Sequence, residues 1–313
     1  MSSFGSKLRF ASVLALLMVS AFFHRAVAQG RQSGEIRGTV TDQSQALIQG
    51  VTVTVTNVST GVRLTLTTEA SGLYDAPYVQ PGEYSVTFAK DSFKTLTRTG
   101  ITLHVETITV NASLEVGAAS EKVSVTGEAP LVQTESAVKN TVLTSRVVTD
   151  SPSANRSWYD LLAVLPGVNP GGGEQSSGQT VGVNGQQPFN ANWQIDGGIA
   201  MLGQSANPDS MAPPLESIEE VSLNTANFGA EHGNGLSVFN VITKSGTNRF
   251  HGSVYEYNQN EFFNARNAFV QGPKPTQRWN EYGFNLGGPI KRNKAFFFVN
   301  YERNPIRDFA PNP

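Results

Sequence analysis

The sequence has no cysteine and carries few charges for its length. The absence of cysteine excludes disulfide bonds, thiolate metal ligands and a cysteine nucleophile. Only 15% of the 313 residues are charged and the formal net charge is -2, so no basic surface is available to neutralise nucleic-acid phosphates. Low hydrophobicity and high net charge, the marks of a disordered chain, are both missing. What remains is a chain with 30 glycines, a pattern that favours β structure.

Patterns typical of catalytic and metal sites are missing as well. The four histidines, His24, His104, His232 and His251, do not have the spacing of a zinc site. The sequence also lacks a nucleophile elbow, a phosphate-binding loop and a dinucleotide-binding glycine fingerprint. Asp196 is interpreted as a turn residue rather than as an acid or base. We therefore expect a protein that is not an enzyme and that has no cofactor and no metal.

The first 28 residues have the pattern of a secretory signal peptide. Lys7 and Arg9 precede an apolar run over Phe10–Phe23, and Ala26–Ala28 follows as a small-x-small cleavage site. The run is too short for a transmembrane helix, which needs about 20 apolar residues. The sequence therefore predicts export and cleavage after Ala28.

Residues 34–116 alternate between apolar and polar side chains, with turn residues between the runs. Such short alternating runs predict strands that each bury one face, and about seven of them in this length favour a two-sheet β-sandwich. The apolar parity changes near Glu106 and Thr107, which predicts a bulge or bend there. The side chains expected to face the core include Ile36, Val40, Val51, Val53, Val55, Val62, Leu64, Leu66, Tyr84, Val86 and Phe88.

Four motifs of this segment resemble the carboxypeptidase regulatory-like domain: Gly38–Asp42, Gly50–Val53, Gly72–Tyr74 and Pro81–Val86. The resemblance implies a prealbumin-like, carbohydrate-binding-like sandwich over residues 29–117, without peptidase activity. One departure is Asp91–Phe93, where the family has glycine before the phenylalanine.

The next segment, residues 118–246, contains a predicted helix and four short motifs. An apolar stripe predicts the helix over Ser157–Leu165, which Pro166 and Gly167 end. The motifs are Leu165–Val168, Ile195–Gly197, Ser217–Val221 and Asn240–Gly246. In this order they resemble the plug domain of TonB-dependent outer-membrane transporters, and a sandwich ahead of a plug is typical of the Oar-like subfamily.

A short extended run connects the two segments, formed by Lys122, Val123, Ser124, Val125 and Thr126. It fits a last strand of the sandwich, a plain connecting strand, or an edge segment offered to a partner by strand addition. By the resemblance it is the candidate TonB box, the strand that a periplasmic energising protein captures.

The remaining residues, 247–313, resemble the start of the barrel of Oar-like proteins. Apolar and polar side chains alternate in Phe250–Tyr257, Tyr282–Leu286 and Phe297–Tyr301, and a long polar connection over Gln259–Arg278 contrasts with a short one over Pro289–Lys294. Three strands and no terminal strand cannot close a barrel, which needs about eight or more. We therefore expect the chain to be a fragment of a longer protein; a genuine short exported protein is the alternative.

Together these features predict a mainly β protein with a sandwich, an α+β plug and the first strands of an incomplete transmembrane β-barrel. The expected function is that of the N-terminal part of an outer-membrane receptor that takes up a substrate. Its expected partners are outer-membrane lipid, a TonB-type energising protein and a glycan or peptide ligand, but no nucleic acid. The alternative is a secreted or periplasmic carbohydrate- or peptide-binding sandwich without transport activity, and a peptidase accessory subunit is a third hypothesis.

Overall fold

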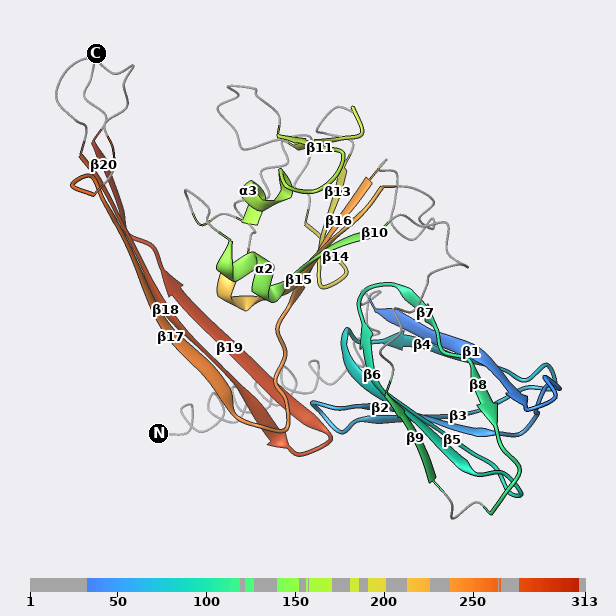
Figure 1. Ribbon diagram of the computed structural model, residues 1–313. Helices are drawn as coiled ribbons and strands as arrows, with labels where there is room; N and C mark the ends of the chain where they lie inside the picture. Colours follow the sequence, from blue (N-terminus) through green and yellow to red (C-terminus); the bar gives the residue numbers. More distant parts are fainter. Residues whose placement is uncertain are drawn as a thin grey trace, which may run out of the picture. The chain divides into compact units, whose positions relative to one another are not determined.

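The computed structural model describes most of the chain after residue 32 (Figure 1). The segment 1–28, expected to be a signal peptide, lies outside the described residues. The described ranges are 33–118, 122–126, 140–151, 156, 158–170, 181–185, 191–200, 213–225, 237–263, 265 and 276–309.

The sandwich consists of two sheets that enclose one apolar core. In the first sheet the strand order is β4-β1-β7, with β8 also paired to β1, and in the second it is β3-β2-β5-β6-β9. The core contains side chains from both sheets, among them Ile36 and Phe88, neither of which is exposed. The strands are β1 (Gly34–Asp42), β2 (Thr52–Asn57), β3 (Arg63–Thr67), β4 (Leu73–Val79), β5 (Gly82–Ala89), β6 (Thr95–Leu103), β7 (Thr107–Thr109), β8 (Ala112–Leu114) and β9 (Lys122–Thr126).

One expectation for the sandwich is wrong and another is confirmed. Val62 and Leu64 are exposed, because β3 is the edge strand of its sheet and only Leu66 of this run reaches the core. The expected bend lies at Val105 and Glu106, where the chain passes from the second sheet to the first: β6 ends at Leu103 and β7 begins at Thr107. The buried side of the chain changes there because the two sheets face each other across the core.

Asp91–Phe93 lacks the glycine of the family motif but still forms the turn that glycine would make. Ser92 has φ of 70°, in the left-handed region that favours glycine. The Phe93 N–H donates to the Lys90 carbonyl at 3.2 Å within the loop between β5 and β6, and the Ser92 carbonyl accepts a hydrogen bond from the Gly117 N–H at 3.1 Å, which ties this loop to the segment after β8. A serine therefore occupies a glycine conformation here.

The central sheet has the order β10-β15-β16-β13-β14, and its core stacks Trp193 on Phe239 with ring centroids 4.2 Å apart. The predicted helix is confirmed but shorter, since only Trp158–Leu162 is helical, and Leu165 is buried in the turns that follow. A second short helix, α2, has too few residues to show a helical period. The elements are β10 (Asn140–Thr144), α2 (Ser145–Asp150), α3 (Trp158–Leu162), β11 (Val168–Pro170), β12 (Val181–Val183), β13 (Ala191–Ile195), β14 (Gly198–Ile199), the 3-10 turn η3 (Leu215–Ser217), β15 (Ile218–Asn224) and β16 (Ser237–Thr243).

Asp196 is a turn residue, as the sequence predicts. It links β13 to β14 with φ of 48°, followed by Gly197 with φ of 81°. Its carboxylate accepts hydrogen bonds from the Thr243 N–H at 2.9 Å and the Thr243 hydroxyl at 2.7 Å. These two hydrogen bonds tie the turn to the end of β16.

The C-terminal sheet contains β17 (His251–Asn260), β18 (Thr276–Lys291), β19 (Ala295–Arg303) and β20 (Ile306–Phe309). The order is β17-β18-β19, and β20 pairs with the first part of β18. The structure therefore adds a short fourth strand to the three that the alternation predicts. Among the described residues, none of the helices is long and apolar enough to cross a membrane.

Candidate functional site

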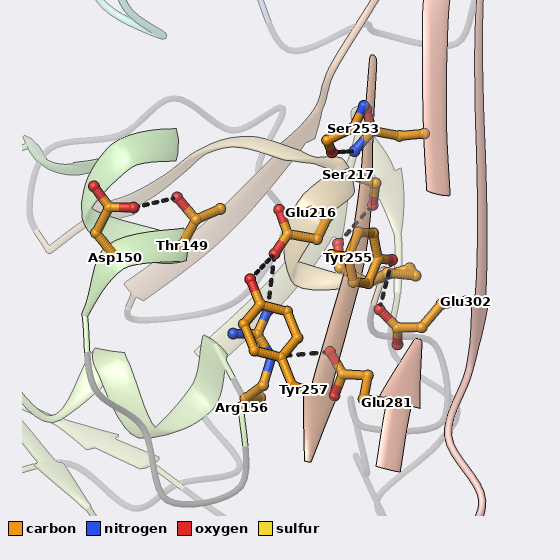
Figure 2. A network of polar contacts seen from close by, with 12 residues as sticks. Thr149, Asp150, Arg156, Glu216, Ser217, Ser253, Tyr255, Tyr257, Glu281 and Glu302 are labelled. Atoms are coloured by element: carbon orange, nitrogen blue, oxygen red, sulfur yellow. Dashed lines mark hydrogen bonds and ion pairs between the residues drawn. The ribbon is translucent and has the colours of Figure 1, made fainter. Parts of the chain in front are cut away.

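The central and C-terminal sheets are joined by a buried cluster around Arg156 (Figure 2). The Arg156 Nε donates a hydrogen bond to Glu281 Oε1 at 2.9 Å, and its Nη2 donates to Glu216 Oε1, also at 2.9 Å. The Tyr257 hydroxyl donates to the same Glu216 oxygen at 3.0 Å, and its ring centroid lies 3.3 Å from the Arg156 guanidinium carbon. One cation thus holds two carboxylates and an aromatic ring.

Backbone structure and nearby hydrogen bonds position Glu216 and Arg156 in this cluster. Glu216 projects from η3, where the Ser217 hydroxyl donates to the Pro214 carbonyl at 2.7 Å and the Lys244 ammonium donates to the Glu216 carbonyl at 3.0 Å. Arg156 itself has φ of 48°, a conformation that costs energy for a residue with a side chain. The surrounding contacts therefore hold Arg156 in a conformation that it would not favour alone.

The ion pairs of the Arg156 cluster are largely buried, whereas Tyr257 is partly open to water. The side chains of Arg156, Glu216 and Glu281 are 16%, 11% and 5% exposed. Burial alone would lower the pKa of Arg156, but the hydrogen bond and charge of Glu281, together with the charges of Tyr257 and Glu216, raise that pKa above its ordinary value. Because the ion pairs are shielded from water, removal of the arginine would leave two buried carboxylates without a cation.

A third buried carboxylate joins the central sheet to the sandwich. Glu220, on β15, accepts a hydrogen bond from the Val105 N–H at 3.1 Å and lies 2.8 Å from the His104 Nδ1. The Asn140 amide donates to the Val105 carbonyl at 3.2 Å. The hydrogen bond to Glu220 raises the pKa of His104 above its ordinary value, although burial acts in the opposite direction.

The C-terminal sheet has one polar and one apolar face. Glu281 and Asn285 are buried on the polar face, and the Tyr255 hydroxyl donates to Glu302 at 3.1 Å (Figure 2). The apolar side chains of the opposite face are 39 to 88% exposed, as the alternation in the sequence predicts. They are Val254, Tyr282, Phe284, Leu286, Val299 and Tyr301.

The apolar face carries a shallow groove of about 480 Å³. Val254, Phe284 and Tyr301 lie in one row across β17, β18 and β19, and the rings of Phe284 and Tyr301 stack with centroids 5.9 Å apart. Phe250 lines the groove beside this row. The sheet therefore presents aromatic and aliphatic groups outward and carboxylates towards Arg156.

The sequence-predicted site residues lie elsewhere. Lys122–Thr126 form β9, which pairs in parallel with β6 at the edge of the second sandwich sheet. Ala28, the expected cleavage site, lies outside the described residues. Sequence reasoning missed the Arg156 cluster, although Glu281 could have been found as an acidic residue on the polar side of an alternating strand. Among the described residues, no group of His, Asp and Glu side chains could hold a metal ion.

Family models match three consecutive parts of the chain. The carboxypeptidase regulatory-like domain matches residues 35–115, the TonB-dependent receptor plug domain matches residues 132–237, and the outer membrane beta barrel domain matches residues 242–311. The Arg156 cluster thus joins two residues within the plug match to two within the barrel match.

Curated relatives agree with these matches. The TonB-dependent transporter Oar of Myxococcus xanthus is 29% identical over 291 residues, which is 86% of this chain and 26% of that protein. The ferrienterobactin receptor of Escherichia coli is 28% identical over 170 residues, which is 49% of this chain and 21% of that protein. The chain thus spans about a quarter or less of the length of these relatives.

Among solved structures, the siderophore receptor PirA from Acinetobacter baumannii aligns with 25% identity and a TM-score of 0.41 over 53% of this chain and 24% of that one. The three domain matches and their order agree with the motifs in the sequence. The chain is therefore similar to TonB-dependent receptors, with a carboxypeptidase regulatory-like match ahead of the plug and barrel matches.

Proposed function

We propose that this chain forms the N-terminal portion of an outer-membrane receptor that takes up a substrate with energy from a TonB-type periplasmic protein. In this proposal residues 1–28 direct export, residues 29–117 form the sandwich, residues 118–246 form the plug, and residues 247–313 begin the barrel. The sandwich and plug lie on the periplasmic side. The relatives that match this chain are transporters and receptors rather than enzymes.

The observation that supports this proposal best is the polar nature of the contact between plug and barrel strands. Arg156 binds Glu216 of the plug and Glu281 of β18. A buried ion pair is a poor permanent attachment, because well-packed apolar groups of the same volume stabilise as much or more. Its charged groups are readily hydrated once the surfaces separate. Such a contact suits a plug that must leave the barrel wall and return.

The apolar face of the C-terminal sheet supports outer-membrane lipid as a partner. Exposed Val254, Phe284 and Leu286 would bury their side chains in hydrocarbon, whereas Glu281 and Asn285 face the plug side. This division matches the apolar-out, polar-in pattern of membrane barrels. The edges of the sheet require further strands, because unpaired backbone groups are costly in lipid.

Lys122–Thr126 remain the candidate strand for the energising partner. As β9 they are already extended, and β6 is the one described strand that pairs with them. Strand addition needs an extended segment with accessible backbone groups. The exposed Ser124 and Val125 are consistent with such access.

Fractionation of cells that express the protein from its own locus tests the proposal. An epitope in the exposed turn at Gln43 and Ser44 would mark the chain without touching the core. We expect the tag in the outer-membrane fraction, together with capture by the periplasmic domain of the cell's TonB-type protein. A tag that remains in the soluble periplasm and a purified sandwich that binds glycans or peptides would favour the alternative binding protein.

A further inference from the structure

One end of the sandwich contacts two other regions of the chain. This end contains the turn over residues 57–61, between β2 and β3, and the bend at Val105, after β6. The strand registers place both at the same end of the second sheet, because Asn57 is paired with Tyr84 of β5 and Tyr84 with Ile101 of β6. The bend binds a carboxylate of the central sheet, whereas the 57–61 turn binds the C-terminal sheet.

The 57–61 turn is held in one shape by its own hydrogen bonds. The Asn57 Oδ1 accepts from the Ser59 N–H at 3.0 Å and from the Thr60 N–H at 2.8 Å. The Gly61 N–H donates to the Asn57 carbonyl at 2.8 Å. These three donors are engaged within the turn, which leaves the Ser59 and Thr60 carbonyls as acceptors for another part of the chain.

Asn248 binds both carbonyls. It lies between β16 and β17, and its N–H donates to the Ser59 carbonyl at 3.0 Å. Its side-chain amide donates to the Thr60 carbonyl and, at 2.7 Å, to Asn293 Oδ1. Its own Oδ1 accepts from the Asn293 N–H at 2.9 Å, in the turn between β18 and β19. An asparagine side chain offers two N–H donors and one acceptor oxygen, and Asn248 uses all three.

The segment that carries Asn248 is fixed against the C-terminal sheet. Gly246 is buried, and a Cβ atom there would lie 2.7 Å from the Gly288 carbonyl oxygen of β18 and 2.9 Å from the Phe297 nitrogen of β19. Only a residue without a side chain fits so close to the two strands. Asn248 and Asn293 therefore form one surface at the end of the C-terminal sheet, and the 57–61 turn contacts that surface.

The contacted end of the C-terminal sheet is the one with the short connection. β18 and β19 are joined by residues 292–294, whereas β17 and β18 are separated by residues 261–275. Short connections of bacterial membrane barrels lie on the periplasmic side. The proposed function places the sandwich on that same side, so the contact at Asn293 agrees with the expected orientation of both regions.

We infer that the sandwich is docked on the periplasmic end of the barrel through Asn248, as a fixed support rather than as a domain held only by its linker. This inference rests on the proposed function, which makes the C-terminal sheet the start of the barrel. The bonds at Asn248 join neutral groups, so this contact does not titrate, unlike the contact between His104 and Glu220. Movement of the plug would break the contact at Glu220, but the sandwich would stay attached to the barrel at Asn248.

A disulfide between the 57–61 turn and the β18–β19 turn tests the docking, because the sequence has no cysteine of its own. A Cβ atom at Gly61 would lie 3.2 Å from the Asn293 Cγ, the position that a cysteine sulfur would take, which suits a disulfide. The test variant is Gly61→Cys/Asn293→Cys. The control variant Ser71→Cys/Asn293→Cys keeps the same barrel cysteine and moves the other to an exposed turn at the opposite end of β3.

The rate of disulfide formation is measured in cells that express the protein from its own locus, by mass spectrometry of the linked peptides after mild oxidation. We expect the Gly61→Cys/Asn293→Cys pair to close at least tenfold faster than the Ser71→Cys/Asn293→Cys pair. In the unmodified protein, the Asn248 N–H should be protected from hydrogen exchange. Equal rates for the two pairs, or an Asn248 N–H that exchanges as fast as an unstructured one, would overturn the docking.

The substitution Asn248→Asp tests the role of this residue in the docking. It replaces the donating amide with a carboxylate oxygen that faces the Thr60 carbonyl. In the Gly61→Cys/Asn293→Cys background, we expect Asn248→Asp to slow closure at least tenfold. Asn258→Asp is the matched control, because it makes the same change of charge within β17 and should leave the rate unchanged. An unchanged rate in Asn248→Asp would overturn the assigned role.

Fractionation of the same cells separates this inference from the proposed function. If the protein is in the outer membrane and the two cysteine pairs close equally fast, the docking is wrong and the proposed function stands. If the protein is in the soluble periplasm and the Gly61→Cys/Asn293→Cys pair closes faster, the contact at Asn248 stands, but its assignment to a membrane barrel fails together with the proposed function.

Discussion

The sandwich and the central sheet differ in what they bury. Outside its tyrosines, the sandwich has one buried polar side chain among the described residues, Thr68, which accepts from the Val51 N–H and donates to the Ile48 carbonyl. The central sheet and its 3-10 turn bury several polar groups, among them Glu216, Glu220 and Asn240. Both regions also have a large apolar cluster of their own.

The difference follows from where the contacts of each region lead. The buried side chains of the sandwich pack on one another, so its stability comes from apolar area removed from water. The two buried glutamates of the central region instead contact neighbouring regions: Glu216 binds Tyr257 of β17, and Glu220 binds His104 and Val105 of the sandwich. The sandwich is thus built as a self-sufficient unit, whereas the central sheet is built to hold, and to be released from, its neighbours.

The largest expected effect comes from the apolar core of the sandwich. Phe88 is fully buried and makes an edge contact with the Tyr74 ring, with centroids 5.7 Å apart. Replacement Phe88→Ala should lower the free energy of unfolding of the sandwich by about 4 kcal/mol, because it removes burial and leaves a cavity. Hydrogen exchange should rise in the sandwich strands and stay unchanged in the central sheet.

The exposed Val58 provides the control, since Val58→Ala should change stability by less than about 0.5 kcal/mol. Equal loss of protection in both regions after Phe88→Ala would show that the sandwich does not fold as a unit of its own.

The second effect concerns the buried charges. Arg156→Ala leaves Glu216 and Glu281 without their cation and should weaken the contact between plug and β18 by about 3 kcal/mol. Proteolysis and hydrogen exchange at β15 and β18 would measure it. Arg146→Ala is the matched control, because its ion pair with Asp150 is exposed and exposed pairs contribute about 0–1 kcal/mol. An equal effect of the two substitutions would contradict the importance of the Arg156 cluster.

A smaller effect of opposite sign is expected at the strained turn of the sandwich. Ser92→Gly should stabilise the protein by about 0.5–1 kcal/mol, because glycine adopts the observed φ of 70° without the cost that a Cβ atom imposes. Thermal unfolding measures the gain. Ser71→Gly, in an exposed turn where serine has no positive φ, should instead destabilise by increasing the entropy of the unfolded chain. Destabilisation by both would contradict the assigned strain.

The smallest effect is a dependence on pH at the contact between sandwich and central sheet. The pKa of His104 is raised in the folded protein by Glu220. The stabilisation from this pair is therefore fully present below the ordinary value of 6.5 and is lost as the pH rises through the raised value. Hydrogen exchange at Val105 should increase over that interval, and His104→Gln should remove the dependence. If hydrogen exchange at Val105 depends on pH in the same way in His104→Gln, the dependence comes from other groups, such as Glu106 or Glu219.

Alternation of apolar and polar residues predicts most of the strands. A strand that buries one face has an apolar side chain at every second position, and this pattern can be read from neighbouring residues. It correctly places Val51 and Phe88 in the core. It fails at Val62 and Leu64, because burial on an edge strand depends on what the opposite sheet covers. At Glu106 the change of parity correctly predicts a bend, but it does not show that the chain passes there from one sheet to the other.

The sequence by itself determined the resemblance to a family, the order of the three segments and the two faces of the C-terminal strands, since each depends on residues that are neighbours in the chain. Only the tertiary structure decided which charges meet. Arg156 and Glu281 are 125 positions apart, and His104 and Glu220 are 116 positions apart. No local period links such pairs, because the packing of whole sheets brings them together. The same holds for β9: its residues specify a strand, but the free edge of β6 decides where that strand lies.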